Sequence, residues 1–363
     1  MARTLMVMAG GTGGHIYPGL AVAAVLRAQG WQVIWLGTRQ GMEARIVPGY
    51  GYDMAWLTMG GVRGNGWLRK LLLPGMLLLA FAQALRALLH YRPDVVLGMG
   101  GYPSFPGGMM AVLLAKPLVI HEQNAIAGLS NRLLACVADK VIVGFPDAFT
   151  NAGDKPVPCG KVANRLWLGN PVRAEIAALP ANKGERSGRL RLLVVGGSLG
   201  AAVLNEVIPQ ALQLMPEVLR PEVVHQAGAR HADELRAHYA RLGVVADVRD
   251  FIADMAQVYA WCDVAITRAG ALTIAELAAA GVPSLLVPYP HAVDDHQTEN
   301  ARFLVAEGAA QLIAQENLTP KQLAQTLLHL DREQLNSMAQ RAKSLGKLDA
   351  SAAVAQVCVE LAR

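Results

Sequence analysis

Short apolar runs alternate with predicted helices along most of the chain. The clearest runs in the first half cover residues 5–9, 32–36, 94–97, 117–121 and 140–143. Further runs follow near Leu192, Val223, Val245 and Val264 and over residues 284–287. This alternation is typical of parallel sheets that are covered by helices on both faces. We therefore expect an α/β fold built from parallel strands.

The alternation lapses over residues 151–188, where Pro, Gly, Asn and Lys become frequent. Such a composition favours a linker, and a chain of 363 residues suffices for two domains of ordinary size. We predict an N-terminal domain over residues 1–165 and a C-terminal domain over residues 166–345. The chain reads as helical from residue 319 onward with a break at Gly346, so that the segment 346–363 can pack back onto the first domain.

Two of the apolar runs end in glycine-rich turns. The first turn is Gly-Gly-Thr-Gly-Gly-His at residues 10–15, before a predicted helix over 18–29, and the second is Gly-Gly-Ser-Leu-Gly at 196–200, before a predicted helix over 201–214. A turn between strand and helix presents unpaired N–H groups and the positive end of the helix dipole, which favour an anion. A single turn of this kind is equally well explained as a tight connection between a strand and a helix that binds no ligand. Two copies indicate two doubly wound domains.

Neither turn carries a common nucleotide signature. Ile16 stands where the dinucleotide fingerprint has a third Gly or Ala, and the run at 32–36 is followed by Gly37 and Thr38 rather than by an acidic residue. The Gly-Lys-Ser/Thr of the Walker motif is missing from both turns. These observations leave a nucleotide-like or phosphorylated ligand that is bound without either signature.

Composition and charge limit the classes of molecule that this chain is expected to bind. Hydrophobic residues make up 53% of the chain and charged residues 17%, with a net charge of +5. A basic, apolar protein fits an anionic partner, but no basic run is interleaved with aromatic residues, so nucleic acid is not expected. An anionic membrane surface or a diphosphate substrate agrees better with both properties.

Residues 67–89 form an unusually apolar helix candidate. Basic residues surround it: Arg63, Arg69, Lys70, Arg86 and Arg92. A membrane span is rejected because Gln83 and Arg86 fall inside the length of about 20 apolar residues that a crossing requires. Two interpretations remain, a buried core helix and an apolar surface that rests on anionic lipid.

The four cysteines are scattered, and no histidine cluster has metal-ligand spacing. This distribution indicates reduced thiols and no structural zinc. The first strand follows the N-terminus directly, which leaves no room for a signal peptide. We expect a cytosolic chain.

Polar or glycine-rich segments follow several of the predicted strands, where an open parallel sheet binds its ligands. His15 directly follows the first turn, and histidine, which titrates near neutral pH, suits a general base that deprotonates an alcohol. The alternative is a capping or solvated histidine. Glu276 lies early in a predicted helix over 273–280, where its carboxylate can accept from a ribose diol or only complement the helix N-terminus.

The motifs together resemble the MurG family. They are Gly-Gly-Thr-Gly-Gly-His (10–15), Gly-Met-Gly-Gly-Tyr (98–102), His-Glu-Gln-Asn (121–124), Gly-Asn-Pro-Val-Arg (169–173), Gly-Gly-Ser-x-Gly (196–200) and Gly-Ala-Leu-Thr (270–273). They occur in the family's order and cover nearly the whole chain.

This resemblance implies an inverting glycosyltransferase that moves N-acetylglucosamine from UDP-N-acetylglucosamine to lipid I, making lipid II for peptidoglycan. It implies the GT-B architecture, two Rossmann-like domains facing a cleft, and neither cofactor nor metal. It also implies a peripheral enzyme at the cytoplasmic face of the inner membrane, in contact with anionic lipid and other cell-wall synthesis proteins.

The resemblance also implies site residues. His15 becomes the base for the acceptor's 4-hydroxyl. The residues implied to bind substrate are Thr12, Gly13, Gly14, Asn124, Arg173, Ser198, Ile252, Ala271, Leu272, Thr273, Ile274, Ala275, Glu276 and Gln297. Within this set, Arg173 and Ser198 are expected near the diphosphate, the backbone of Ile252 at the uracil, Glu276 on the ribose and Gln297 on the sugar. The candidate acceptor contacts are Gly101, Tyr102, His121 and Glu122.

The chain departs from the family pattern at Leu199, Ala269 and Ala275, and the first two changes remove side-chain hydrogen bonds near the donor. Two rival functions stay open. One is a UDP-N-acetylglucosamine 2-epimerase, which binds the same donor without a lipid acceptor. The other is a non-catalytic protein that binds nucleotide sugar or lipid.

Overall fold

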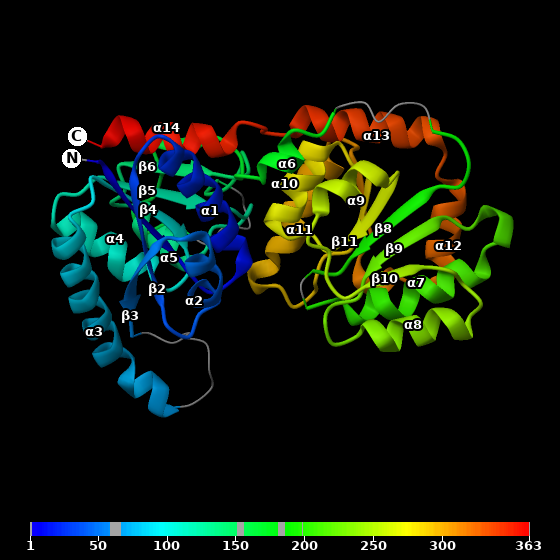
Figure 1. Ribbon diagram of the computed structural model, residues 1–363, viewed down its shortest axis with the longest axis horizontal. Helices are drawn as coiled ribbons and strands as arrows, with labels where there is room; N and C mark the ends of the chain where they lie inside the picture. The colour runs from blue at the N-terminus through cyan, green and yellow to red at the C-terminus, as the bar shows by residue number, and fades with distance from the viewer. Residues whose placement is uncertain (1, 59–66, 151–155, 181–185, 198, 363) are drawn as a thin grey trace. The chain divides into compact units, whose positions relative to one another are not determined.

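The computed structural model describes residues 2–58, 67–150, 156–180, 186–197 and 199–362 (Figure 1). They form two compact units, one of Met1–Val172 with Asp349–Arg363 and one of Arg173–Leu348. Each unit has its own parallel sheet with helices on both faces, which confirms the predicted fold class.

The first unit contains the strands β1 (Thr4–Ala9), β2 (Gln32–Thr38), β3 (Asp53–Leu57), β4 (Val95–Gly100), β5 (Leu118–Glu122), β6 (Lys140–Val143) and β7 (Arg165–Trp167). Its helices are α1 (Gly13–Ala28), α2 (Glu43–Ile46), α3 (Trp67–Tyr91), α4 (Ser104–Leu113), α5 (Leu129–Leu134) and α14 (Ala350–Leu361). The sheet order is β3-β2-β1-β4-β5-β6-β7, so the direction of winding reverses between β1 and β4.

Strand β1 shows why this sheet needs helices on both faces. All its residues are buried, and because side chains alternate along a strand, they divide between two cores. Leu5 and Val7 pack in one core with residues of α1 and α14, whereas Met6 and Met8 pack in the other with residues of α3, α4 and α5.

The first unit extends beyond the expected boundary. β7 pairs in parallel with β6, so residues 165–167 belong to this sheet and the unit continues to Val172. Helix α14 contributes Val354, Ala355 and Cys358 to the core around β1. The stretch predicted as linker therefore contains sheet structure, and only residues 151–155 and 181–185 of it lie outside the described part of the chain.

The second unit contains the strands β8 (Arg191–Val195), β9 (Glu222–Gln226), β10 (Asp247–Arg249), β11 (Val264–Thr267), β12 (Ser284–Leu286) and β13 (Ala310–Leu312). Its helices are α6 (Ala174–Ala177), α7 (Ala202–Leu214), α8 (Ala232–Arg241), α9 (Met255–Trp261), α10 (Ala271–Ala280), α11 (His296–Val305), α12 (Pro320–His329) and α13 (Arg332–Leu345). The order β10-β9-β8-β11-β12-β13 reverses direction between β8 and β11, at the place equivalent to β1 and β4.

Helix α1 begins five residues before the predicted start at residue 18. Pro18 lies inside it, although an interior proline removes one N–H and its ring crowds the carbonyl four residues before it. The helix nevertheless begins at Gly13, directly after Thr12. His15 consequently lies in the first turn of this helix rather than in the loop before it.

The expectation of four reduced cysteines is wrong for one pair. Cys136 and Cys159 form a disulfide with their Cα atoms 5.5 Å apart, across a separation of 23 residues. A spacing of 23 residues does not predict the pairing, because the two cysteines come together only when the chain beyond α5 folds. Cys262 and Cys358 are buried free thiols.

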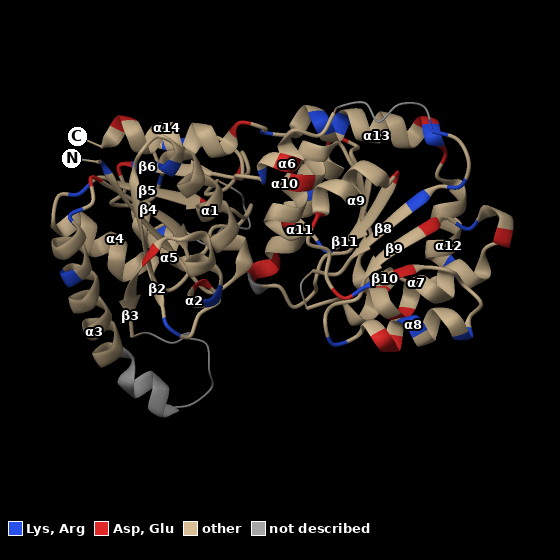
Figure 2. Cartoon of the chain, viewed as in Figure 1, with Lys and Arg blue, Asp and Glu red and all other residues tan. Residues whose placement is uncertain are grey.

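Helix α3 holds the apolar segment that the sequence singled out. Between Pro74 and Tyr91 the only charged side chain is Arg86, and Figure 2 shows the described part of the helix almost without charge. Leu78, Leu79 and Leu89 are 70%, 47% and 55% exposed. Arg63 and the side chains of Arg69 and Lys70 lie outside the described part. None of the described helices has the length and apolar character of a membrane crossing.

Candidate active site

The turns after β1 and β4 meet at the point where the first sheet reverses its winding, which is where open parallel sheets bind ligands. A Cβ atom added to Gly101 would lie 2.1 Å from the carbonyl oxygen of Gly10, and Gly101 has a φ of +81°. Only glycine permits this approach of backbone to backbone. The ring of Tyr102 lies next to the first turn, with Cε2 4.0 Å from a Cβ placed on Gly11.

A buried carboxylate braces the first turn. Glu43 accepts hydrogen bonds from the backbone N–H of Gly11 at 3.2 Å and from that of Thr38 at 2.9 Å. Its side chain is fully buried. The N–H of Gly11 is therefore used internally, and the donors available to a ligand are the first N–H groups of α1, which have no intrahelical partner. Thr12, Gly13 and Gly14 carry that helix start.

His15 occupies the third position of α1 and is partly exposed. Its Nδ1 lies 2.9 Å from Oε1 of Gln123. The ring packs against the end of β4, since a Cβ on Gly100 would lie 3.0 Å from both Cε1 and Nδ1 of His15. Helix α1 therefore carries the ring of His15, and Gly100 at the end of β4 and Gln123 after β5 fix its orientation.

The segment 121–124 follows β5, and its polar atoms are used inside the first unit. His121 is fully buried and its Nε2 lies 2.9 Å from the carbonyl oxygen of Gly169. Glu122 is 2% exposed and accepts from the backbone N–H groups of Asn124 at 2.9 Å and Gly128 at 3.0 Å. These two side chains shape the loop that carries Asn124, rather than facing solvent.

In the second unit the corresponding turn follows β8. A Cβ on Gly200 would lie 2.0 Å from the carbonyl oxygen of Ala227, with φ at +78°, so glycine is required here as well. Ser198, predicted to contact the diphosphate, lies outside the described residues. The side chain of Leu199 is 86% exposed.

Gln226, at the end of β9, connects this turn to the segment after β10. Its Nε2 donates to the carbonyl oxygen of Gly197 at 2.9 Å, and its Oε1 accepts from the N–H of Ile252 at 2.9 Å. Gln226 is 3% exposed. The sequence analysis did not identify this residue, although it ends a predicted strand, and ligands of parallel sheets bind beyond the carboxyl ends of strands.

Arg173 and Glu276 form an ion pair. Nε and Nη2 of Arg173 donate to Oε1 of Glu276 at 3.2 and 2.9 Å, and the hydroxyl of Tyr259 donates to Oε2 at 3.2 Å. Burial raises the pKa of Glu276, and the charge of Arg173 offsets part of that shift. The carboxylate predicted for the ribose is thereby oriented by two neighbours, of which Tyr259 was not anticipated.

Helix α10 begins directly after Gly270, so Ala271, Leu272 and Thr273 are its first residues and Ala275 lies one turn in. Ile274 is fully buried and its N–H donates to the carbonyl oxygen of Gly270 at 3.0 Å, so its side chain and its N–H are both used inside the unit. Gln297 accepts from the N–H groups of Ala269 and Tyr289 at 3.3 and 2.9 Å, so its amide nitrogen can donate to a ligand.

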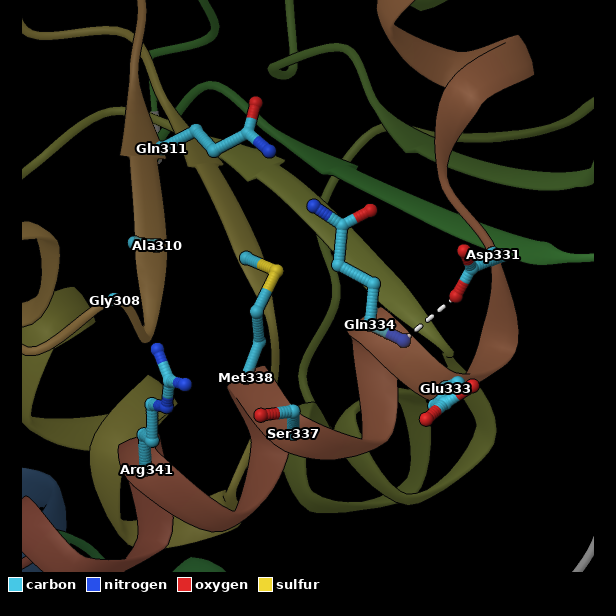
Figure 3. Close-up of a pocket in the computed structure, with 9 residues that line it drawn as sticks. All are labelled: Gly308, Ala310, Gln311, Asp331, Glu333, Gln334, Ser337, Met338 and Arg341. Carbon is cyan, nitrogen blue, oxygen red and sulfur yellow. Dashed lines mark hydrogen bonds between the residues drawn. The ribbon is translucent and has the colours of Figure 1, made fainter.

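A pocket of about 500 Å³ lies elsewhere in the second unit, beside β13 and α13 (Figure 3). Its floor includes the capping contact from the N–H of Gln334 to Asp331 at 2.7 Å. It shares no residue with the motifs of the sequence, so we do not assign it to the active site. No cluster of three or more His, Cys, Asp or Glu suited to a metal occurs among the residues that the structure describes.

Family models match both halves of the chain. Residues 5–143 match the glycosyltransferase family 28 N-terminal domain, and residues 191–356 match the glycosyltransferase family 28 C-terminal domain. A curated relative from Thiobacillus denitrificans is 62% identical over 99% of both chains. Another from Dechloromonas aromatica is 56% identical over 100% of both chains. Both are named UDP-N-acetylglucosamine--N-acetylmuramyl-(pentapeptide) pyrophosphoryl-undecaprenol N-acetylglucosamine transferase.

Solved structures give the same picture. The crystal structure of MurG from Acinetobacter baumannii matches with a TM-score of 0.83 and 39% identity over 99% of both chains. The UDP-GlcNAc 2-epimerase of Neisseria meningitidis matches with a TM-score of 0.68 but 15% identity, over 99% of this chain and 100% of that one. The second likeness concerns the fold alone.

Proposed function

This chain belongs to glycosyltransferase family 28 and to the MurG enzymes within it, and from that premise we propose how its two units carry out the transfer. The enzyme moves N-acetylglucosamine from UDP-N-acetylglucosamine to lipid I and so makes lipid II. Its fold is the GT-B architecture. The similarity to curated transferases over the whole length is the observation that carries this activity.

We assign the donor to the second unit. The N–H groups at the start of α7 suit the UDP diphosphate, because a helix start favours negative charge. The N–H of Ile252 already donates to Gln226 at 2.9 Å, which leaves its carbonyl oxygen to accept from uracil. Glu276 would accept from the ribose hydroxyls, and Gln297 would donate to the sugar through its amide nitrogen.

We assign the acceptor to the first unit, beside the start of α1. His15 is the base in this proposal, and its support is its place at the switch point between β1 and β4. Tyr102 and Gly101 would face the acceptor's sugar or diphosphate, with Asn124 near the transferred sugar. His121 and Glu122 act through the loop that they shape, since their polar atoms bond inside the unit.

The chemistry follows from these positions. Nε2 of His15 takes the proton of the acceptor's 4-hydroxyl while that oxygen attacks the anomeric carbon of the donor sugar. The bond from this carbon to the diphosphate oxygen breaks, and its electron pair leaves with UDP. Backbone N–H groups at the second turn stabilise the charge that develops there. Attack from the opposite face inverts the anomeric configuration and gives a β-1,4 link.

We also propose that α3 rests on the cytoplasmic face of the inner membrane. Its support is the exposure of Leu78, Leu79 and Leu89 on a helix whose described part carries one charge, Arg86. An apolar helix surface with basic residues beside it is the arrangement that binds anionic lipid. The enzyme would then bind its lipid-linked acceptor at the membrane surface in which that acceptor is anchored.

The decisive experiment incubates the full chain with UDP-N-acetylglucosamine and a short-chain lipid I analogue. We expect the disaccharide product, together with UDP release that depends on the acceptor. Conversion of the donor sugar in the absence of lipid I would favour the epimerase. Donor binding with no turnover under any condition would favour a binding protein. Retained transfer in a His15→Ala variant would remove His15 from the role of base.

A further inference from the structure

His15 is the first member of a chain of hydrogen bonds that ends on the backbone. Its Nδ1 lies 2.9 Å from Oε1 of Gln123, and Nε2 of Gln123 lies 3.1 Å from Nδ1 of His121. Nε2 of His121 lies 2.9 Å from the carbonyl oxygen of Gly169. Two buried side chains, Gln123 and His121, thus connect the partly exposed His15 to the backbone of Gly169.

The chemistry of the last acceptor sets the direction of the whole chain. A carbonyl oxygen can only accept, so Nε2 of His121 carries a hydrogen. Burial lowers the pKa of His121 to about 4, and the ring is therefore neutral near pH 7 with a lone pair on Nδ1. That lone pair requires a donor, which must be the amide nitrogen of Gln123.

The orientation of this amide follows from its surroundings, independently of how nitrogen and oxygen are distinguished. Nε2 of Gln123 also donates to the carbonyl oxygen of His121 at 3.2 Å, so the nitrogen faces His121. The oxygen then faces His15 and accepts from it. Nδ1 of His15 consequently carries the hydrogen, and the lone pair of the neutral ring lies on Nε2.

We propose that Gln123 and His121 are positioning residues that hold His15 in its Nδ1–H tautomer, with Nε2 as the proton acceptor. This inference rests on the proposed role of His15 as base. Free neutral histidine favours the other tautomer, which places the hydrogen on Nε2 and blocks it. Gln123 selects the reactive tautomer without adding a charge, because its oxygen is an amide oxygen.

The arrangement also suits the protonated state that follows proton transfer. When Nε2 of His15 takes a proton, Nδ1 still donates to Gln123, so no hydrogen bond has to change partner. Gln123 is 1% exposed and His121 is fully buried, so water does not compete for their contacts. The backbone of Gln123 is fixed as well, since its carbonyl oxygen accepts from Nδ2 of Asn170 at 2.9 Å.

The direct test is nuclear magnetic resonance of the full chain without substrate. Ring nitrogens of ¹⁵N-labelled histidine report the tautomer at mildly alkaline pH, and His15 is assigned by the signals lost in His15→Ala. We expect the Nδ1–H form of His15 in the parent. In Gln123→Met, which keeps the length of the side chain but removes its hydrogen bonds, we expect the Nε2–H form to dominate.

Either of two results overturns the proposal: an Nε2–H tautomer of His15 in the parent, or an unchanged Nδ1–H tautomer in Gln123→Met. If that variant does not fold, Gln123→Asn gives the same test, because the side chain is one methylene too short to span both rings. The measurement needs no turnover. Failure of the proposed transferase activity is therefore seen separately, as a parent enzyme that forms no disaccharide.

Kinetics distinguish positioning from general damage. We expect Gln123→Met to lower kcat by about tenfold to 100-fold, with the KM for UDP-N-acetylglucosamine nearly unchanged. This loss is smaller than the roughly 10²–10⁴-fold that a positioned base contributes, because His15 itself remains. Gln123→Glu should restore part of kcat, because its carboxylate accepts from the same Nδ1–H. Gln356→Met is the matched control, an exposed glutamine of the first unit whose side chain donates to Glu360. A rise in KM with unchanged kcat would contradict a role through His15.

Discussion

Arg173 holds Glu276 by two donors on a single carboxylate oxygen. Nη2 and Nε of the guanidinium donate to Oε1 at 2.9 and 3.2 Å, while Oε2 accepts from the hydroxyl of Tyr259 at 3.2 Å. The two residues are 103 positions apart in sequence. The carboxylate proposed to bind the ribose is therefore fixed before the donor arrives, and of its about four lone-pair sites these contacts leave one, on Oε2, for a ribose hydroxyl.

Glu276→Gln should weaken donor binding with little effect on kcat. The change keeps the shape of the side chain but removes a charged acceptor, and hydrogen bonds to charged groups contribute about 1.5–3 kcal/mol. We expect the KM for UDP-N-acetylglucosamine to rise by about tenfold or more. Glu175→Gln, an exposed carboxylate on α6, is the control and should leave KM unchanged. An unaltered KM in Glu276→Gln would remove this residue from the donor site.

Arg173→Ala should destabilise the second unit. It leaves the carboxylate of Glu276, whose side chain is 14% exposed, without its cation. Breaking a fully buried pair costs about 3–5 kcal/mol, and because Arg173 is 39% exposed we expect roughly 1–3 kcal/mol in urea unfolding. Adding Glu276→Gln to this variant should recover part of the loss. If the double variant is no more stable than Arg173→Ala, the pair is not coupled.

Gln226→Met should impair UDP binding by releasing the second turn from the Ile252 segment. Both hydrogen bonds of this amide, to Gly197 and from Ile252, are 2.9 Å long and buried. We expect UDP affinity, measured by calorimetry, to fall about tenfold, because each net hydrogen bond contributes about 1 kcal/mol. Gln213→Met, at an exposed position near the end of α7, should bind UDP as the parent does. Equal affinities for the two variants would exclude the connecting role.

Acidification should destabilise both units through buried histidines. Burial lowers the pKa of His121 to about 4 and that of His225 to about 3, from an unfolded value of 6.5. The unfolded chain therefore binds more protons below pH 6.5, and the free energy of unfolding falls as pH decreases toward the folded values. We expect a loss of about 2 kcal/mol for each histidine at pH 5.

The same measurement on His225→Phe separates this effect from general acid sensitivity. Its unfolding free energy should depend less steeply on pH than that of the parent between pH 6.5 and 5, whatever its absolute stability. His329→Asn removes an exposed histidine and should keep the parental slope. An unchanged slope in His225→Phe would mean that this residue is not neutral in the folded protein.

Replacing Leu78 and Leu79 by Ser should release the enzyme from anionic vesicles. Burying an exposed leucine in an apolar phase contributes about 1.5–3 kcal/mol, so two replacements should lower sedimentation with phosphatidylglycerol vesicles by about tenfold or more. The control replaces Val218 and Leu219, which are 74% and 59% exposed in the second unit. Equal binding by both double variants would reject α3 as the lipid contact.

Some of the fold escaped prediction for a physical reason. β3 and β7 lie at the edges of the first sheet and β13 at an edge of the second, and none of them was anticipated. Edge strands have fewer buried positions, as the half-exposed pattern of β3 shows, so they lack the continuous apolar run that marks a central strand. The central strands β1, β4, β8 and β11 were all found from such runs.

By itself, the sequence determined the two parallel sheets, the glycine turns at both switch points and, through its ordered motifs, the family. These properties depend on residues that are neighbours along the chain, where hydrophobic period and glycine content act. The tertiary structure alone decided which side chains meet: His15 with Gln123 across 108 residues, Arg173 with Glu276 across 103, and Cys136 with Cys159. Periodicity carries no information on such pairs, because they form only when strands and helices from distant parts of the chain pack around a common core.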